Sequence, residues 1–176
     1  MPVRRMNHVV VYAHFYSVPP VSRVIHDQFL HVVVGPQPSL RVYHRPNRLK
    51  LVELYDRAGF FAYHVAEHHQ TPLGMAPSPS VYLSAVAQRT RSLRFGAMIY
   101  ALPLYHPLRM IEEICMLDHI TKGRLELGLS RGASPHESLR HGVVREESRP
   151  RYDEIFNLML GAFRTGYFDG PGPFYK

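Results

Sequence analysis

The sequence predicts an α/β fold with parallel strands. Three apolar segments typical of buried strands begin near residues 60, 93 and 124, and a segment with helical spacing separates each from the next. Strand–helix–strand units that repeat about every thirty residues join parallel strands by right-handed crossovers. Units of this kind build either a doubly wound open sheet or a (β/α)8 barrel.

The first of these strands is predicted over residues 60–66, and a helix over residues 48–58 precedes it. Gly59 stands between them, and glycine is favoured just beyond the end of a helix. Three residues at helical spacing are expected to face the core: Leu51, Leu54 and Tyr55.

The second helix is predicted to begin at Ser78 and Pro79, an N-cap residue followed by proline at the first helical position. It should end near residues 89–91, and a strand over residues 93–102 follows it. The expected apolar stripe of this helix consists of Val81, Tyr82, Ala85 and Val86.

The third helix is predicted to begin at Pro107 and to end at Lys122 and Gly123. Its expected inward-facing residues are Leu108, Ile111, Ile114 and Cys115. The last strand covers residues 124–129, and its residues alternate between two faces. Leu125, Leu127 and Leu129 are expected to face the helices. On the other face we expect Gly128 to leave space for a flat or large group.

Polar residues at the ends of two strands favour the barrel over the open sheet. Glu67 and His68 follow one strand, and Ser130 and Arg131 follow another. Barrel enzymes build their sites from the carboxyl ends of several strands. The glycine-rich turn expected in a dinucleotide-binding open sheet is missing from the sequence.

Residues 1–47 differ in composition from the rest of the chain. Residues 1–50 contain seven Arg or Lys but one acidic residue, so they carry most of the net charge of +7. Frequent prolines leave little room for a helix, and the β-branched runs at residues 9–12 and 32–34 are candidate strands. We expect a divergent basic segment holding strand one, followed by the barrel over residues 48–176. A charge bias without a recognition motif does not predict nucleic-acid binding.

The composition predicts a soluble cytoplasmic protein that does not bind membranes. The sequence has no run of 18 or more apolar residues and no export signal at its N-terminus. Cys115 is the single cysteine, which excludes an intramolecular disulfide and fits a reducing compartment. Its place in an apolar stripe predicts a buried, inert thiol.

Glu67, His68 and His69 form the main candidate for chemistry. A carboxylate and two imidazoles can transfer protons or bind metal at neutral pH. Adjacent residues on a strand point to opposite faces, and the sequence has no second cluster of metal ligands. We therefore expect acid–base chemistry and no metal.

Two stretches carry a resemblance to a known family: AEHHQTPLG at residues 66–74 and LRFGAMIYALPLYHPLRMIEEICMLDHITKGRLELGLSRG at residues 93–132. From about residue 49 to residue 176 the chain resembles the N-terminal half of the bacterial luciferase-like flavin-dependent monooxygenases, which are (β/α)8 barrels. The resemblance implies a partial barrel of about the first four βα units. Residues 167–176 correspond to the hairpin before the fifth strand, so we expect a truncated barrel that needs an oligomer or a second chain to function.

The resemblance also implies roles for residues near the flavin ring. His68 matches a histidine that acts as a catalytic base, and Glu67 matches its acidic neighbour at the cofactor. His69 has no matching catalytic role, so we expect a structural one. Ser130 stands at the cofactor where luciferase itself has a reactive cysteine, which argues against light emission but leaves a hydroxyl for the flavin edge.

Three further residues are implied to bind the cofactor. Met98 and Ile99 match a non-proline cis peptide bond beneath the flavin ring. Arg131 matches an arginine that contacts the flavin phosphate, and a guanidinium can bind phosphate oxygens bidentately. The simpler alternative for Arg131 is an ion pair with Glu126 or Glu137.

The activity implied by the resemblance is monooxygenation of a small-molecule substrate by reduced FMN and oxygen. A flavin reductase would supply the reduced FMN. One alternative is hydride transfer with the deazaflavin coenzyme F420, because related barrels use the same pocket. The other is a catalytically inactive half-barrel or partner-binding module. The sequence does not identify the substrate.

Overall fold

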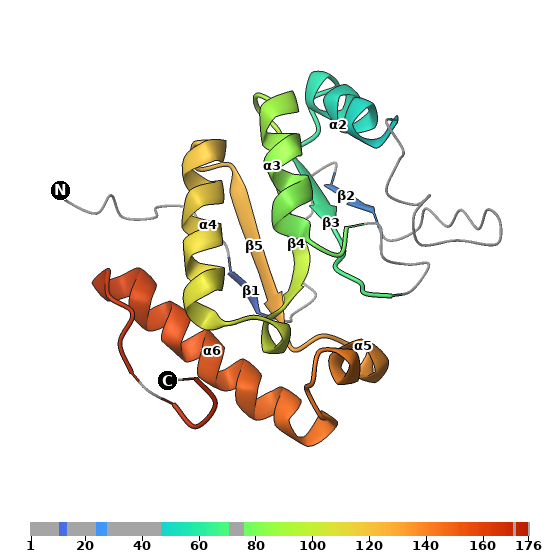
Figure 1. Cartoon of the computed structure of the whole chain (residues 1–176). Helices are drawn as coiled ribbons and strands as arrows, with labels where there is room; N and C mark the ends of the chain where they lie inside the picture. The colour runs from blue at the N-terminus through green and yellow to red at the C-terminus, as the bar shows by residue number, and fades with distance from the viewer. Residues whose placement is uncertain (1–10, 14–23, 28–46, 71–75, 171, 176) are drawn as a thin grey trace.

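The computed structural model describes residues 11–13, 24–27, 47–70, 76–170 and 172–175. They form a parallel β-sheet with helices packed along one face (Figure 1). The predicted α/β class and parallel strands are therefore confirmed.

Five strands make the sheet, in the order β1-β5-β4-β3-β2. Strands β2 to β5 are neighbours in chain order, as in a barrel, whereas β1 pairs with β5 and places Val11 opposite Leu127. The sheet thus has one strand more than the expected four, because residues 1–47 supply two short strands. The strand bounds are β1 Val11–Ala13, β2 Val24–Asp27, β3 Ala62–Val65, β4 Arg94–Ala101 and β5 Leu125–Ser130.

Strand β1 overlaps the β-branched run predicted at residues 9–12. Strand β2 lies where no strand was predicted, and it pairs with β3 so that His26 is opposite His64. The candidate strand at residues 32–34 lies outside the described residues.

The helices are α2 Asn47–Arg57, α3 Pro79–Arg89, η1 Leu102–Leu104, α4 Pro107–Thr121, α5 Pro135–Arg140 and α6 Arg145–Thr165. Helices α2, α3 and α4 confirm the three predicted helices within one or two residues of their ends. Ser78 precedes α3 as predicted, but its side chain makes no capping hydrogen bond. In the described parts of the chain, no helix is long and apolar enough to cross a membrane.

The core lies between the sheet and helices α3, α4 and α6. Leu125, Leu127 and Leu129 are all buried on the helix-facing side, as predicted, and they pack in one cluster with Phe95 of β4 and Ile114 of α4. Burying one such side chain stabilises the fold by roughly 1.5–3 kcal/mol.

Several helix faces differ from the predicted ones. In α2 the expected Leu51 and Leu54 are exposed and Val52 is buried instead. In α3 the side chain of Val81 is 71% exposed, and Leu83 takes the buried position. These helices have more apolar residues than one face can bury, so their periodicity fits more than one orientation.

Helix α4 shows the same effect at its start. Leu108 is exposed, while Met110, Ile114 and Leu117 are buried. Cys115 is half-buried. Burial raises the pKa of its thiol, and the negative charge of Asp118 raises it further. A raised pKa disfavours the reactive thiolate.

The turn between α3 and β4 is held by one carboxylate. Asp56 of α2 accepts hydrogen bonds from the backbone N–H groups of Arg91 at 2.8 Å, Ser92 at 2.9 Å and Leu93 at 2.7 Å. These three hydrogen bonds form a clamp that ties helix α2 to the turn that leads into β4.

Candidate active site

A pocket of about 190 Å³ lies at the carboxyl ends of β3 and β4. One wall is formed by Ala66, Glu67 and His68, which follow β3. Met98 and Ile99 of β4 form the floor, and the rest of the lining comes from η1, the loop after β5 and helix α5. The pocket is therefore built at strand ends, where the sequence placed the site.

Four of the six predicted site residues meet in this pocket: Glu67, His68, Met98 and Ile99. Ser130 is the last residue of β5, half-buried and opposite Ala101 of β4, and Arg131 beyond it is exposed. Neither of these two lines the pocket, although the chain enters its wall directly afterwards at Gly132.

The peptide bond between Met98 and Ile99 is cis, as the resemblance implied. The pairing of β4 with β5 shifts register at the same place, between Ala97 and Tyr100. The expectation that Gly128 leaves room for a ligand is wrong, because the backbone of β4 fills that space. A Cβ at Gly128 would lie 2.6 Å from the carbonyl oxygen of Ala97.

The carboxylate of Glu67 is buried and accepts three hydrogen bonds. The backbone N–H of Ala101 donates to Oε2 at 2.9 Å, and the hydroxyl of Tyr105 donates to Oε1 at 2.8 Å. Nε2 of His69 also donates to Oε1, at 2.7 Å. Glu67 therefore ties the end of β3 to the end of β4, and Tyr105 is a site residue that no sequence signal indicated.

His69 has the structural surroundings expected of it. Its hydrogen bond to Glu67 raises the pKa of the imidazole, against the opposing effect of burial. Its ring also contacts that of His141, with the centroids 4.5 Å apart in an edge-to-face arrangement. Burial, and then the charge of His69, lower the pKa of His141.

His68 turns the other way, toward helix α5. Its Nδ1 lies 3.3 Å from Oε1 of Glu137, a buried pocket residue that the site prediction missed. The spacing of Ser134 and Glu137 was an available signal, since serine at an N-cap and glutamate three residues later form a capping box.

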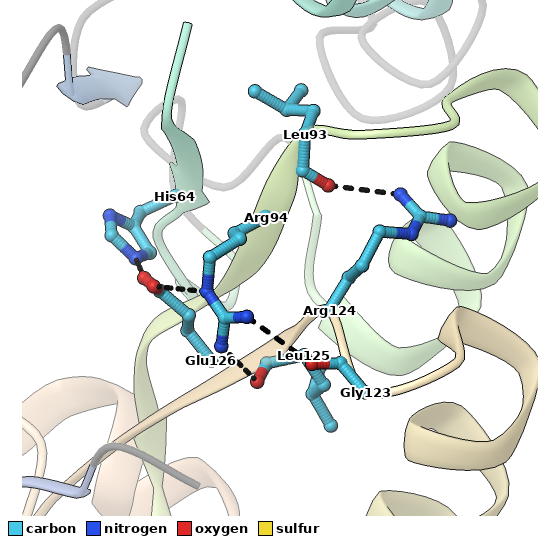
Figure 2. A network of polar contacts seen from close by, with 7 residues as sticks. All are labelled: His64, Leu93, Arg94, Gly123, Arg124, Leu125 and Glu126. Atoms are coloured by element: carbon cyan, nitrogen blue, oxygen red, sulfur yellow. Dashed lines mark hydrogen bonds and ion pairs between the residues drawn. The ribbon is translucent and has the colours of Figure 1, made fainter. Parts of the chain in front are cut away.

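A second polar network lies on the sheet face opposite the helices (Figure 2). Oε2 of Glu126 lies 2.6 Å from Nε2 of His64, and its Oε1 accepts a hydrogen bond from Nε of Arg94 at 3.0 Å. Burial raises the pKa of Glu126, but the bonds from His64 and Arg94 outweigh it and leave the pKa lowered. The network joins β3, β4 and β5, since His64, Arg94 and Glu126 each come from a different one of these strands.

The two carboxylates considered as partners of Arg131 are thus bonded elsewhere. Glu126 binds His64 and Arg94, and Glu137 faces His68. Within the described ranges, no group of three His, Cys, Asp or Glu side chains is arranged to hold a metal ion.

A family model described as luciferase-like monooxygenase matches residues 29–176. The chain belongs to the luciferase-like monooxygenase family. The match covers most of the chain, including all residues of the candidate site. The resemblance of the sequence to this family is therefore confirmed.

Two curated relatives each match about three-quarters of this chain. An uncharacterized protein of Sinorhizobium fredii is 48% identical over 130 residues, which make up 74% of this chain and 38% of that protein. The oxygenase component of the flavin-dependent trigonelline monooxygenase of Acinetobacter baylyi is 34% identical over 130 residues, 73% of this chain and 36% of that protein. The chain thus spans less than two-fifths of the length of these relatives.

Solved structures confirm the partial barrel. The oxygenating constituent of 3,6-diketocamphane monooxygenase from Pseudomonas putida, solved with FMN, superposes with a TM-score of 0.66 at 25% identity, over 76% of this chain and 40% of that chain. The coenzyme F420-dependent tetrahydromethanopterin reductase of Methanopyrus kandleri gives a TM-score of 0.57 at 19% identity, over 89% of this chain and 44% of that chain. The second likeness concerns the fold alone.

The pocket fits one side of a flavin. Its lining combines apolar residues, among them Met98, Ile99 and Leu104, with the imidazole of His68, which suits a flat ring with polar edges. Its volume of about 190 Å³ is below the roughly 300–1,000 Å³ of complete ligand pockets. The described residues therefore supply part of a ligand pocket of that size.

Proposed function

We propose that this chain forms the flavin-binding N-terminal part of a monooxygenase that uses reduced FMN and oxygen. The observation that carries the proposal is the meeting of Glu67, His68, Met98 and Ile99 in one pocket at the strand ends. Bound FMN would supply the oxygen chemistry, and the protein would orient the ring and exclude water.

His68 is proposed as the group that moves protons. Its side chain lies in the pocket wall and is 32% exposed, so a bound molecule can reach it. An imidazole can accept or donate a proton near neutral pH. Glu67 is less available for proton transfer, because Ala101, Tyr105 and His69 all donate hydrogen bonds to its oxygens.

The backbone of β4 and the loop after β5 are proposed to hold the cofactor. Met98 and Ile99 would lie beneath the ring, where their cis peptide forms part of the pocket floor. Arg131 is exposed, and its planar guanidinium would bind the phosphate. Ser130, one residue earlier at the end of β5, would offer its hydroxyl to the flavin edge.

A reductase partner and a completing chain are part of the proposal. The Acinetobacter relative is the oxygenase component of its enzyme, which supports a separate protein that delivers reduced FMN. The pocket of about 190 Å³ is smaller than a complete ligand pocket, so a second chain or a further part of the protein would complete it. The activity and substrates of the whole protein rest on this proposal.

Titration of the purified chain with FMN tests the proposal. Flavin fluorescence should change with a dissociation constant of tens of micromolar, and size-exclusion chromatography should show whether binding accompanies oligomerisation. The same titration with the deazaflavin tests the alternative cofactor. If neither flavin binds at concentrations up to about 1 mM, the binding free energy is weaker than roughly −4 kcal/mol. That result would reject the proposal in favour of the inactive half-barrel.

Charge variants show whether the binding is at this site. Arg131→Ala should weaken FMN binding at least tenfold and weaken riboflavin binding little, since riboflavin has no phosphate. Arg109→Ala is the matched control, because Arg109 is an exposed arginine on α4 that pairs with Glu113. Equal loss of FMN affinity in both variants would reject the assignment of Arg131.

A further inference from the structure

Helix α5 begins with half of a capping box. Ser134 is the N-cap residue, and its Oγ accepts a hydrogen bond from the backbone N–H of Glu137 at 3.3 Å. In the complete box, the glutamate side chain would reach back to the backbone N–H of the serine. Here the Glu137 carboxylate faces His68 within the pocket lining instead.

The backbone of α5 fixes the place of this carboxylate. The N–H of Glu137 bonds to Ser134, and its carbonyl oxygen accepts a hydrogen bond from the N–H of His141 at 3.3 Å. Its side chain is 11% exposed, although a glutamate in a helix of six residues could easily extend into water. A buried carboxylate needs a hydrogen-bond donor, and His68 Nδ1 at 3.3 Å is within reach.

The other carboxylate near His68 is already engaged. Glu67 precedes His68 in the chain, but its oxygens accept bonds from Ala101, Tyr105 and His69. Among the described residues, Glu137 is thus the carboxylate that bonds to the His68 ring.

We propose that Glu137 is a positioning residue that holds His68 as the Nδ1–H tautomer and so turns its basic Nε2 toward bound ligands. The inference about catalysis rests on the proposed function of His68. A carboxylate can only accept a hydrogen bond, so the hydrogen between the two groups is carried by Nδ1. In a neutral imidazole the other nitrogen, Nε2, then has the free lone pair. The basic Nε2 of His68 is thus oriented before a ligand binds.

The tautomer of His68 can be measured without any flavin. The full chain labelled with ¹⁵N-histidine is examined by NMR at a pH well above the usual histidine pKa of about 6.5, and the His68 signals are assigned by their loss in His68→Gln. The nitrogen chemical shifts distinguish a protonated ring nitrogen from an unprotonated one. Wild-type protein should show the Nδ1–H form as the major species. A major Nε2–H form in wild-type protein would overturn the proposal.

Two substitutions at Glu137 separate a positioning role from simple packing. In Glu137→Ala the acceptor is lost, and the major tautomer should change to Nε2–H, the form that histidine prefers in water. In Glu137→Gln the amide oxygen can still accept a hydrogen bond from Nδ1–H, so this variant should keep the wild-type tautomer. An unchanged tautomer in Glu137→Ala would overturn the proposal. The wild-type measurement decides it even if that variant does not fold.

His136→Ala is the matched control, because His136 is an exposed neighbour on the same helix. Its signals should disappear and those of His68 should not move. The outcome is independent of the FMN titration. An Nδ1–H tautomer without FMN binding would reject the proposed function but support the role of Glu137. FMN binding with an Nε2–H tautomer would support the proposed function but reject the role of Glu137.

Discussion

Gly128 of β5 lies directly against the carbonyl group of Ala97 in β4, so that a Cβ atom at residue 128 would come within 2.6 Å of the carbonyl oxygen. This carbonyl stands immediately before the cis peptide of Met98 and Ile99. The glycine is required for space, since a backbone group cannot move aside as a flexible side chain can. The irregular end of β4, which forms the pocket floor, therefore depends on the absence of a side chain on the neighbouring strand.

Gly128→Ala is expected to destabilise the protein by about 1–3 kcal/mol, the usual cost of overpacking a filled interior. The added methyl group would also push β4 at Ala97, so the floor at Met98 and Ile99 should shift and FMN binding should weaken. Urea denaturation measures the first effect, and the FMN titration measures the second.

Gly161→Ala is the control for this substitution. Gly161 lies in α6, and a Cβ there would have nothing within 4 Å. Alanine should stabilise the helix there by up to about 1 kcal/mol. If Gly128→Ala were as stable as Gly161→Ala, the close approach of β5 to Ala97 would not constrain the sheet.

Glu126→Gln is expected to cost about 3 kcal/mol in the free energy of unfolding. Glu126 binds both His64 and Arg94 on the sheet face away from the helices (Figure 2). Removing one partner from a buried ion pair costs about 3–5 kcal/mol. The lower value applies because Arg94 is 21% exposed and also donates to the carbonyl oxygen of Gly123.

Chemical denaturation of Glu126→Gln and Glu112→Gln at neutral pH measures this cost. Glu112 is 54% exposed on α4, so its substitution should change stability by less than about 0.5 kcal/mol. Equal effects of the two substitutions would show that the Glu126 network contributes no more than a surface ion pair.

The positions of β3, β4 and β5 were predictable because apolar runs mark them in the sequence, whereas β2 was not predicted. The run before Glu67 and the alternating leucines of β5 are typical of buried strands, and both strands were found where predicted. The helix faces were less predictable. Leu54 and Val52 in α2 are both apolar, and Val52 is the one that joins the buried core cluster, which depends on packing between segments distant in the sequence.

The site was predictable as a place but not as a set of contacts. Glu67 and His68 follow a strand in the sequence, so their location at the pocket followed from the fold. The partner of His68 could not be predicted, because Glu137 is 69 residues away along the chain. The role of Gly128 was misjudged for the same reason, since its neighbour is the backbone of another strand.

Asp56→Asn tests the clamp on the turn before β4. Burial raises the pKa of Asp56, but the N–H groups of Arg91, Ser92 and Leu93 outweigh it, so the folded-state pKa lies below the usual value of 3.8. The charged carboxylate therefore stabilises the fold above about pH 4, and this contribution is lost as pH falls through the folded-state pKa. The substitution should cost about 1–2 kcal/mol at pH 7.

Urea denaturation of wild-type protein and Asp56→Asn between pH 7 and pH 3 measures the loss of this contribution. The difference in unfolding free energy should narrow as the pH falls below about 4, because protonation removes the charge from the wild-type side chain. A difference that stays constant over this range would mean that the charge of Asp56 does not strengthen the clamp.

His69→Gln should show the opposite dependence on pH. The hydrogen bond to Glu67 raises the pKa of His69 above 6.5, with a smaller contribution from Glu137 and an opposing one from burial. A raised histidine pKa means that the stabilisation is complete below pH 6.5 and is lost as pH rises through the folded-state pKa. The substitution should therefore cost about 1–2 kcal/mol at pH 5.5 and less at pH 8.5.

The neighbouring His141 would obscure this trend, because its lowered pKa makes the fold less stable as pH falls. The comparison is therefore made in protein carrying His141→Gln, which removes the second titrating ring of the edge-to-face pair. In that background the unfolding free energy lost on changing His69 should decrease steadily from pH 5.5 to pH 8.5. A loss that grows with pH would mean that the neutral ring, and not the ion pair with Glu67, is the stabilising form.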